Sequence, residues 1–102
     1  MLIYVCHKQN NPSDFKRAVK ITHDLQIKHP EHCFLCPELI FAHILKGEMN
    51  IDDELELRKD VISICDEMYL TSAPDFISKN ELDFAHLLGM EVVHLEEKCR
   101  SI

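Results

Sequence analysis

The sequence is poor in glycine, since its 102 residues include only Gly47 and Gly89. Neither glycine lies in a predicted strand-to-helix turn. Walker-type phosphate loops and dinucleotide-binding loops both need glycines that bring backbone amides close to phosphate. The Gly-x-Ser-x-Gly nucleophile elbow needs two glycines around its serine. The sequence therefore excludes all three classes of site.

Basic clusters and long apolar runs are also missing. The chain carries 11 Lys and Arg against 18 Asp and Glu, for a net charge of -7. This balance disfavours a nucleic acid polymer or an anionic membrane surface as a partner. No apolar run approaches the ~20 residues that span a bilayer, and the apolar part of MLIYVCHK is too short for a signal peptide. We therefore expect a cytoplasmic protein that binds neither membrane nor nucleic acid polymer.

The five cysteines are odd in number and have no disulfide-framework spacing. Most stand beside apolar residues, which is typical of buried, reduced thiols. Cys33 and Cys36, with His29 and His32 just upstream, resemble half of a zinc site, but a second ligand pair is missing. We predict no metal and no cofactor, and a zinc-binding or thiol-redox domain is the last of the alternatives.

Short apolar runs alternate with amphipathic segments along the whole chain. The predicted strands cover residues 2–6, 33–36, 67–71 and 91–95. The predicted helices follow a cap at Asn11 or Ser13, begin at Glu38 and end at Gly47, cover residues 51–65, and follow a cap at Ser78. The residues from Glu96 are either a frayed tail or the start of a last helix.

This order, with 46% hydrophobic residues, predicts one domain over residues 1–102. We expect a three-layer α/β/α sandwich around a parallel sheet of four or five strands, of the flavodoxin-like or Rossmann-like kind. Ligands of such sheets bind at the carboxyl ends of the strands. The loops there comprise residues 7–11, 37–38 and 71–78. The candidate ligand-binding residues are His7, Lys8, Pro37 and Ser78. Of these, His7 either faces the crevice or is an ordinary neutral loop histidine.

Two carboxylates, Asp75 and Glu81, flank the start of the fourth predicted helix. In one interpretation Asp75 is a turn residue, while Ser78 caps the helix and Glu81 completes a capping box. In the other, both are reagents. Tyr4 lies in the first strand, where its buried hydroxyl needs a partner that a carboxylate near a neighbouring strand end can supply.

Several short motifs together resemble the nucleoside 2-deoxyribosyltransferase superfamily, in particular its small bacterial and phage domains. They are IYVC at the first strand, Ala18 in the first helix, PEL after the second strand, ICDEMYL at the third, and D-x5-E-L-x-x-A at the fourth helix. The likeness covers residues 2–95. It implies a transferase or hydrolase that acts on the N-glycosidic bond of a nucleoside or nucleoside-like small molecule.

The resemblance also assigns roles to single residues. It makes Glu81 the nucleophile, Tyr4 the residue that orients it, and Asp75 the base contact or proton source. A carboxylate suits this chemistry, because it can trap the oxocarbenium-like sugar as a glycosyl ester. The resemblance further implies a homodimer or larger assembly in which a neighbouring subunit completes the pocket.

The sequence departs from the family pattern at three positions. Ile77 and Lys79 stand where the family has glycines, and Arg58 stands where an aspartate is expected, eight residues before Asp66. A phosphate cradle is also missing, so a nucleoside is favoured over a nucleotide. These departures support a second function, that of a catalytically inactive relative that binds a nucleotide-like ligand or a protein partner.

Overall fold

The computed structural model describes residues 1–41 and 49–95, which alternate between strands and helices. In chain order the elements are β1 (Leu2–Cys6), α1 (Pro12–Lys28), β2 (Cys33–Leu35), α2 (Pro37–Phe41), α3 (Ile51–Ser63), β3 (Glu67–Leu70), α4 (Phe76–Leu87) and β4 (Glu91–His94). All four predicted strands are confirmed, each to within one residue. The predicted helix end at Gly47 and the tail from Glu96 lie outside the described residues.

The strands form one parallel sheet in the order β2-β1-β3-β4. This confirms the predicted α/β fold class, with four strands and no fifth among the described residues. The chain runs from β1 to β2 on one side, then crosses to β3 and β4 on the other. The carboxyl ends of β1 and β3 therefore flank the point where the chain departs in opposite directions, which is where open α/β sheets bind ligands.

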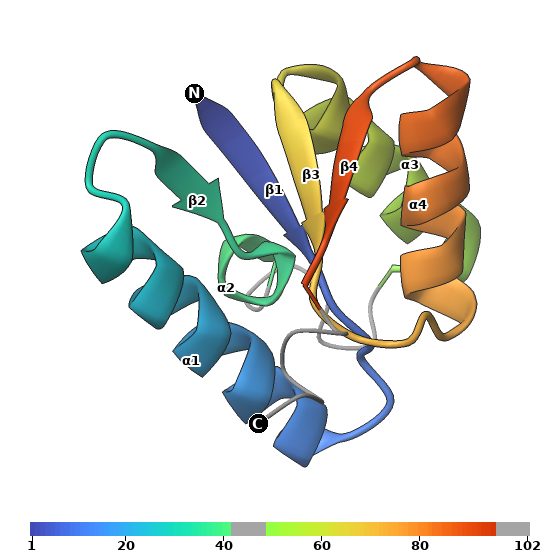
Figure 1. The fold of residues 1–102 in the computed structure, drawn as a ribbon. Helices are drawn as coiled ribbons and strands as arrows, with labels where there is room; N and C mark the ends of the chain where they lie inside the picture. Colours follow the sequence, from blue (N-terminus) through green and yellow to red (C-terminus); the bar gives the residue numbers. More distant parts are fainter. Residues whose placement is uncertain (42–48, 96–102) are drawn as a thin grey trace.

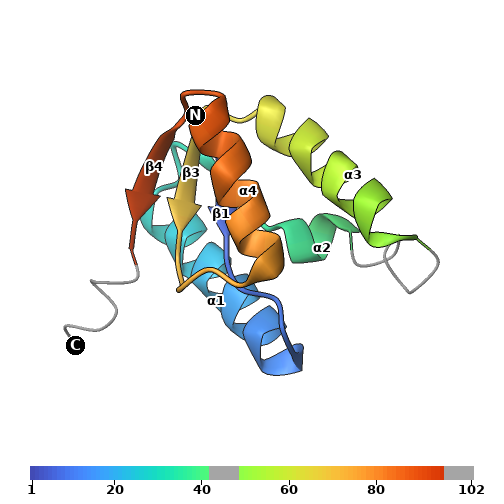
Figure 2. The ribbon, with the colours of Figure 1, turned by 90° about the vertical axis from the view of Figure 1, so that its right-hand side faces the viewer.

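Helices cover both faces of the sheet, with α1 on one face and α3 and α4 on the other (Figures 1 and 2). Alternate side chains of a strand point to opposite faces, so each strand feeds two apolar clusters. Tyr4 and Met68 join Ile62 and Leu82 in the cluster beneath α3 and α4. The smaller cluster on the α1 side is built on Ile3, Val5 and Phe34.

Helices α1, α3 and α4 begin at side-chain caps that satisfy free backbone N–H groups. The Asn11 side chain accepts a hydrogen bond from the backbone N–H of Asp14 and starts α1, as one of the two predicted caps. Helix α4 begins three residues earlier than predicted, because Asp75 and not Ser78 is its cap. Asp75 Oδ1 accepts from the Ser78 backbone N–H, and the Ser78 hydroxyl accepts from the Asp75 N–H. The prediction of a capping box between Ser78 and Glu81 is therefore wrong.

Three of the four cysteines in the described residues are buried, as predicted for most of the thiols. Cys6, Cys36 and Cys65 are buried free thiols, whereas Cys33 is free and exposed. Within residues 1–41 and 49–95, every helix is too short or too polar to cross a bilayer.

Candidate functional site

The candidate site lies at the carboxyl edge of the sheet, beneath the first turns of α4. β1 contributes Tyr4, α4 contributes Glu81, and α3 contributes Arg58. All three side chains are buried. They hold the first strand and the two helices on one face of the sheet in a fixed relation.

Tyr4 and Glu81 are 77 residues apart in the chain, yet the Tyr4 hydroxyl donates a hydrogen bond to Glu81 Oε2. Tyr4 has no exposed surface, and Glu81 is 1% exposed. Glu81 lies in the second turn of α4 and does not contact the helix terminus, so it is not a capping residue. The phenol of the first strand and the acid of the fourth helix therefore meet, but they do so in the protein interior and not at an open hollow.

Arg58 is the part of the site that the sequence analysis missed, since it noted only a missing aspartate there. Its Nη1 donates to Glu81 Oε2 at 3.1 Å, and its Nη2 donates to Glu54 Oε1 and Gln9 Oε1, each at 2.9 Å. One signal could have revealed it. Arg58 precedes buried Ile62 by one helical turn, and a charge on the buried face of a helix needs a partner.

The buried network shifts the pKa values of its members. Burial raises the pKa of Glu81 to about 7, although the charge of Arg58 and the hydrogen bond from Tyr4 oppose it. Burial and the charge of Glu81 raise the pKa of Tyr4 well above its ordinary value. Burial alone would lower the pKa of Arg58, but the interactions with Glu81, Tyr4 and Glu54 together outweigh burial and raise that pKa. At neutral pH Tyr4 is thus a neutral donor, Arg58 is charged, and Glu81 is close to its titration midpoint.

Asp75 has a different environment from Glu81, because its carboxylate is saturated with donors. Oδ1 accepts from the N–H and hydroxyl of Ser78, and Oδ2 accepts from the backbone N–H of Gln9 at 2.7 Å. Partial burial would raise the pKa of Asp75, but these hydrogen bonds outweigh it and lower the pKa. Asp75 is therefore ionised at neutral pH. It ties the loop after β1 to the start of α4 and holds no proton to give to a leaving base.

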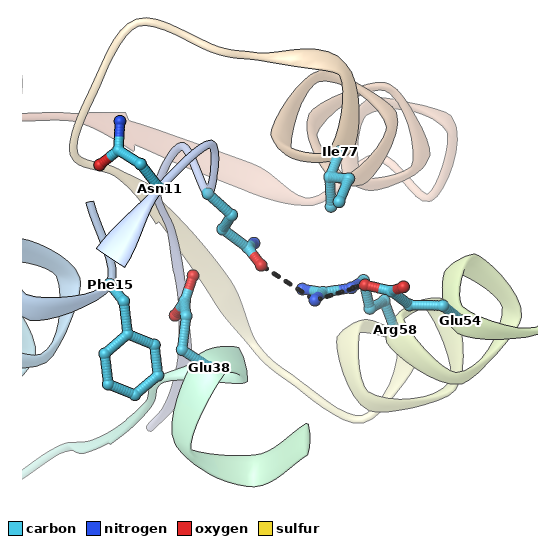
Figure 3. Close-up of a pocket in the computed structure, with 7 residues that line it drawn as sticks. Asn11, Phe15, Glu38, Glu54, Arg58 and Ile77 are labelled. Atoms are coloured by element: carbon cyan, nitrogen blue, oxygen red, sulfur yellow. Dashed lines mark hydrogen bonds and ion pairs between the residues drawn. The ribbon is translucent and has the colours of Figure 1, made fainter. Parts of the chain in front are cut away.

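A pocket of about 220 Å³ opens beside this network (Figure 3). Its lining residues come from the loop after β1 and from all four helices, and they are Gln9, Asn11, Phe15, Glu38, Glu54, Arg58 and Ile77. The volume is below the roughly 300 Å³ at which pockets for drug-sized ligands begin. The pocket therefore suits one ring of a ligand rather than a whole nucleotide. Arg58 lines the pocket and contacts Glu81, which does not line it, so the guanidinium separates the acid from the pocket.

The four predicted ligand-binding residues lie outside the pocket lining. His7 is buried, and its Nδ1–H donates to Thr71 Oγ1 at 2.8 Å, because the Thr71 hydroxyl itself donates to the Cys6 carbonyl. Burial lowers the pKa of His7, so the neutral form is favoured. The Lys8 ammonium lies 3.9 Å from Asp14 Oδ1, while Pro37 and Ser78 are buried.

The two bulky residues at the family's glycine positions have different surroundings. Ile77 lines the pocket and makes its wall thicker than glycine would. Lys79 points to solvent, where its ammonium lies 3.5 Å from Asp83 Oδ1 on the same helix. Only one of the two substitutions therefore narrows the pocket.

Comparisons with protein-family models, with curated proteins and with solved structures found no match. The family resemblance therefore stays a prediction from the sequence motifs. In the parts of the chain that the structure describes, no group of three or more His, Cys, Asp or Glu is arranged to hold a metal ion.

Proposed function

We propose that the chain transfers or hydrolyses the N-glycosidic bond of a nucleoside or nucleoside-like small molecule, with Glu81 as the attacking carboxylate. The observation that carries the proposal is the hydrogen bond from Tyr4 to Glu81 at the carboxyl edge of the sheet. A phenol and a carboxylate that meet there are the two groups that the sequence motifs assign to orientation and attack.

The two oxygens of Glu81 have unequal surroundings, which favours one of them as the nucleophile. Oε2 accepts from both Tyr4 and Arg58. Oε1 has only the Cys6 thiol near it among the described residues, at 3.7 Å. Oε1 therefore keeps free lone pairs, while the donors on Oε2 fix the plane of the carboxylate. This division suits an acid that attacks through one oxygen.

The reaction has two balanced steps. Oε1 bonds to the anomeric carbon as the carbon–nitrogen bond breaks, and the departing base takes the bonding electrons and then a proton from solvent water. Water or a second free base next attacks the same carbon, gives up its own proton to solvent, and releases Glu81 with its electron pair. Arg58 lies between Glu81 and the pocket, so its Nη1 must release Oε2 before the sugar reaches Oε1. Tyr4 then holds Oε2 alone, while Glu54 and Gln9 still bind the other terminal nitrogen of Arg58.

The test incubates the protein with ribonucleosides or 2′-deoxynucleosides and a second free base. Chromatography then measures release or exchange of the base. We expect turnover by the wild type that rises with pH through about 7, where Glu81 loses its proton. Glu81→Gln should abolish it, and Tyr4→Phe should lower kcat by about 100-fold, in the range typical of a positioned proton-bearing group.

The matched control is Glu56→Gln, because Glu56 lies on α3 with a side chain that is 70% exposed. It should leave turnover unchanged. Turnover that survives in Glu81→Gln would refute the assignment of the nucleophile.

A second function is favoured by the burial of Glu81 behind Arg58. An acid that stays ion-paired and out of contact with the pocket suits a catalytically inactive relative that binds a nucleotide-like ligand. In that case nucleosides should raise the melting temperature of the protein, since they bind only the folded state, while no base is released. Turnover by the wild type would decide against it.

We also propose a cytoplasmic location, from the lack of long apolar runs in the sequence, and a homodimer, as the motifs imply. Fractionation of cells that produce the chain tests the first. Sedimentation velocity tests the second.

A further inference from the structure

Glu38 is a buried carboxylate that the catalytic proposal does not use. It stands in the first turn of α2, is 6% exposed and lines the pocket. Its Oε2 accepts a hydrogen bond from the Cys36 thiol at 3.0 Å. Its Oε1 is buried and has no hydrogen-bond partner among the described residues. A buried carboxylate oxygen without a donor is costly, so a ligand that supplies one gains affinity.

Gln9 presents the complementary group to the same pocket. Its Oε1 accepts from Arg58 Nη2 at 2.9 Å. A guanidinium can only donate, so this bond fixes the Gln9 amide with its oxygen toward Arg58 and its NH₂ group elsewhere. The Nε2 atom is buried and also lacks a partner within the described residues. Two residues of the pocket lining, from different parts of the chain, thus carry one buried acceptor and one buried donor without a partner among the described residues.

The rest of the lining restricts what can use these two groups. Phe15 and Ile77 supply apolar surface, and the pocket volume of about 220 Å³ accommodates a flat ring (Figure 3). Glu54 and Glu38 both line the pocket and disfavour a phosphate. A planar heterocycle with an N–H beside an oxygen or nitrogen acceptor has the donor that Glu38 Oε1 lacks and the acceptor that Gln9 Nε2 lacks. The faces of its ring can pack against the apolar side chains of the lining.

We propose that Glu38 and Gln9 read the base of the ligand. Glu38 Oε1 accepts a ring N–H, and Gln9 Nε2 donates to the neighbouring acceptor, as on the lactam edge of thymine, uracil or hypoxanthine. This assignment rests on the proposed function and names the residues that select the base. It gives Glu38 the base contact that the motifs assign to Asp75, whose carboxylate is already saturated.

The test compares nucleosides with counterparts that carry a methyl group on the ring nitrogen. Dissociation constants are measured by calorimetry for thymidine against 3-methylthymidine, and for inosine against 1-methylinosine. With the wild type we expect methylation to weaken binding by about 10- to 100-fold, because it removes the donor and leaves Oε1 unpaired.

The variant Glu38→Met keeps the length of the side chain and removes the acceptor. It should bind the parent and the methylated nucleoside with about equal dissociation constants. The losses of affinity caused by the methyl group and by the substitution are then not additive. Glu56→Met, an exposed change on α3, should retain the wild-type discrimination. Circular dichroism checks that both variants fold, and the comparison within the wild type needs no variant.

The outcomes separate this inference from the proposed function. Equal affinity of the wild type for parent and methylated nucleosides overturns the base-reading role, while base release still tests Glu81 independently. Methyl-sensitive binding without any turnover supports the base-reading pair and leaves only the binding function. If no nucleoside binds and none is cleaved, both proposals are refuted.

Discussion

Arg58 and Glu81 form an ion pair that has almost no contact with water. Arg58 is 2% exposed, and its guanidinium also contacts Glu54, Gln9 and the ring of Phe41. Removing two charges from water costs several kcal/mol per ion, which the pair recovers only through good geometry and further donors. Loss of one partner is therefore more harmful than loss of both.

This asymmetry predicts the effect of Arg58→Met. At pH 7 the substitution should lower the free energy of unfolding by roughly 3–5 kcal/mol, because it strands a buried carboxylate. The loss should shrink near pH 5, where Glu81 is protonated. Urea denaturation at both pH values measures it. Arg17→Met changes an exposed arginine on α1 and should have little effect. Equal losses at both pH values would contradict the assignment to Glu81.

The pH dependence of wild-type stability follows from the raised pKa of Glu81. The pKa is about 7 in the folded protein against an ordinary value of 4.5, so the folded state binds the proton more tightly. The stability that this proton provides is fully present below about pH 4.5 and is lost as pH rises through about 7. Its size is on the order of 3 kcal/mol.

Glu81→Gln should remove this loss, because an amide does not titrate. The measurement is the difference between wild-type and Glu81→Gln unfolding free energies from pH 4.5 to 8. Burial also raises the pKa of Glu38, and taking the difference cancels the contribution of Glu38 to the pH dependence. Parallel curves for the two proteins would show that Glu81 does not titrate in this window.

Single residues were predictable from the sequence only where a motif marked them. Tyr4 and Glu81 belong to such motifs, and the structure joins them. Arg58 lies outside the motifs, and Glu38 belongs to PEL but receives no role from it, because their roles depend on partners 23 and 2 residues away that the sequence does not link to a pocket. Asp75 was assigned to chemistry because its donors, the Gln9 and Ser78 amides, become neighbours only in the folded chain.

At the scale of elements, α4 matters most, because its first turns position Glu81 and Ile77 together. The sequence predicts its start three residues too late, since both Asp75 and Ser78 are good caps. The reciprocal pair of Asp75 and Ser78 decides between them in the structure. The strands are easier to predict, because a short apolar run between turns in an α/β chain is typical of a buried strand.

Because Asp75 caps α4, we predict that Asp75→Ala and Asp75→Asn differ in their free energy of unfolding. Alanine removes the acceptor for the Ser78 and Gln9 amides and should cost about 1–2 kcal/mol of unfolding free energy. Asparagine still caps, so Asp75→Asn should retain most of the stability and also the turnover. A loss of turnover in a stable Asp75→Asn protein would restore the catalytic role. Asp83→Ala, on the exposed side of α4, is the control for stability.

At the scale of the whole molecule, the fold followed from the sequence because four strands and their helices alternate with short links. How copies associate follows less directly. The sequence suggests the helices around Ala42, which lies outside the described residues, and around Leu57 as the face of a homodimer. In the structure, Phe76 and Leu87 of α4 are 72% and 81% exposed. Phe76 directly precedes Ile77 of the pocket, so a second subunit docked there would border the ligand.

We therefore predict that Phe76→Lys converts a homodimer into a monomer, as measured by sedimentation velocity at micromolar concentration. Ile27→Lys introduces the same charge at a similarly exposed apolar position on α1 and should leave the dimer intact. A wild-type monomer, or equal disruption by both substitutions, would exclude this face.

The central place of β1 in the sheet has a consequence for how the protein is made. The strand LIYVC leaves the ribosome before either of its neighbours, and its register with β3 joins Ile3 to Glu67 and Cys6 to Leu70. At about 5–20 residues per second, translation of the intervening segment takes on the order of several seconds. During that interval an apolar, unpaired strand is available to chaperones and to other nascent chains, so slow translation before Leu70 should favour misassembly.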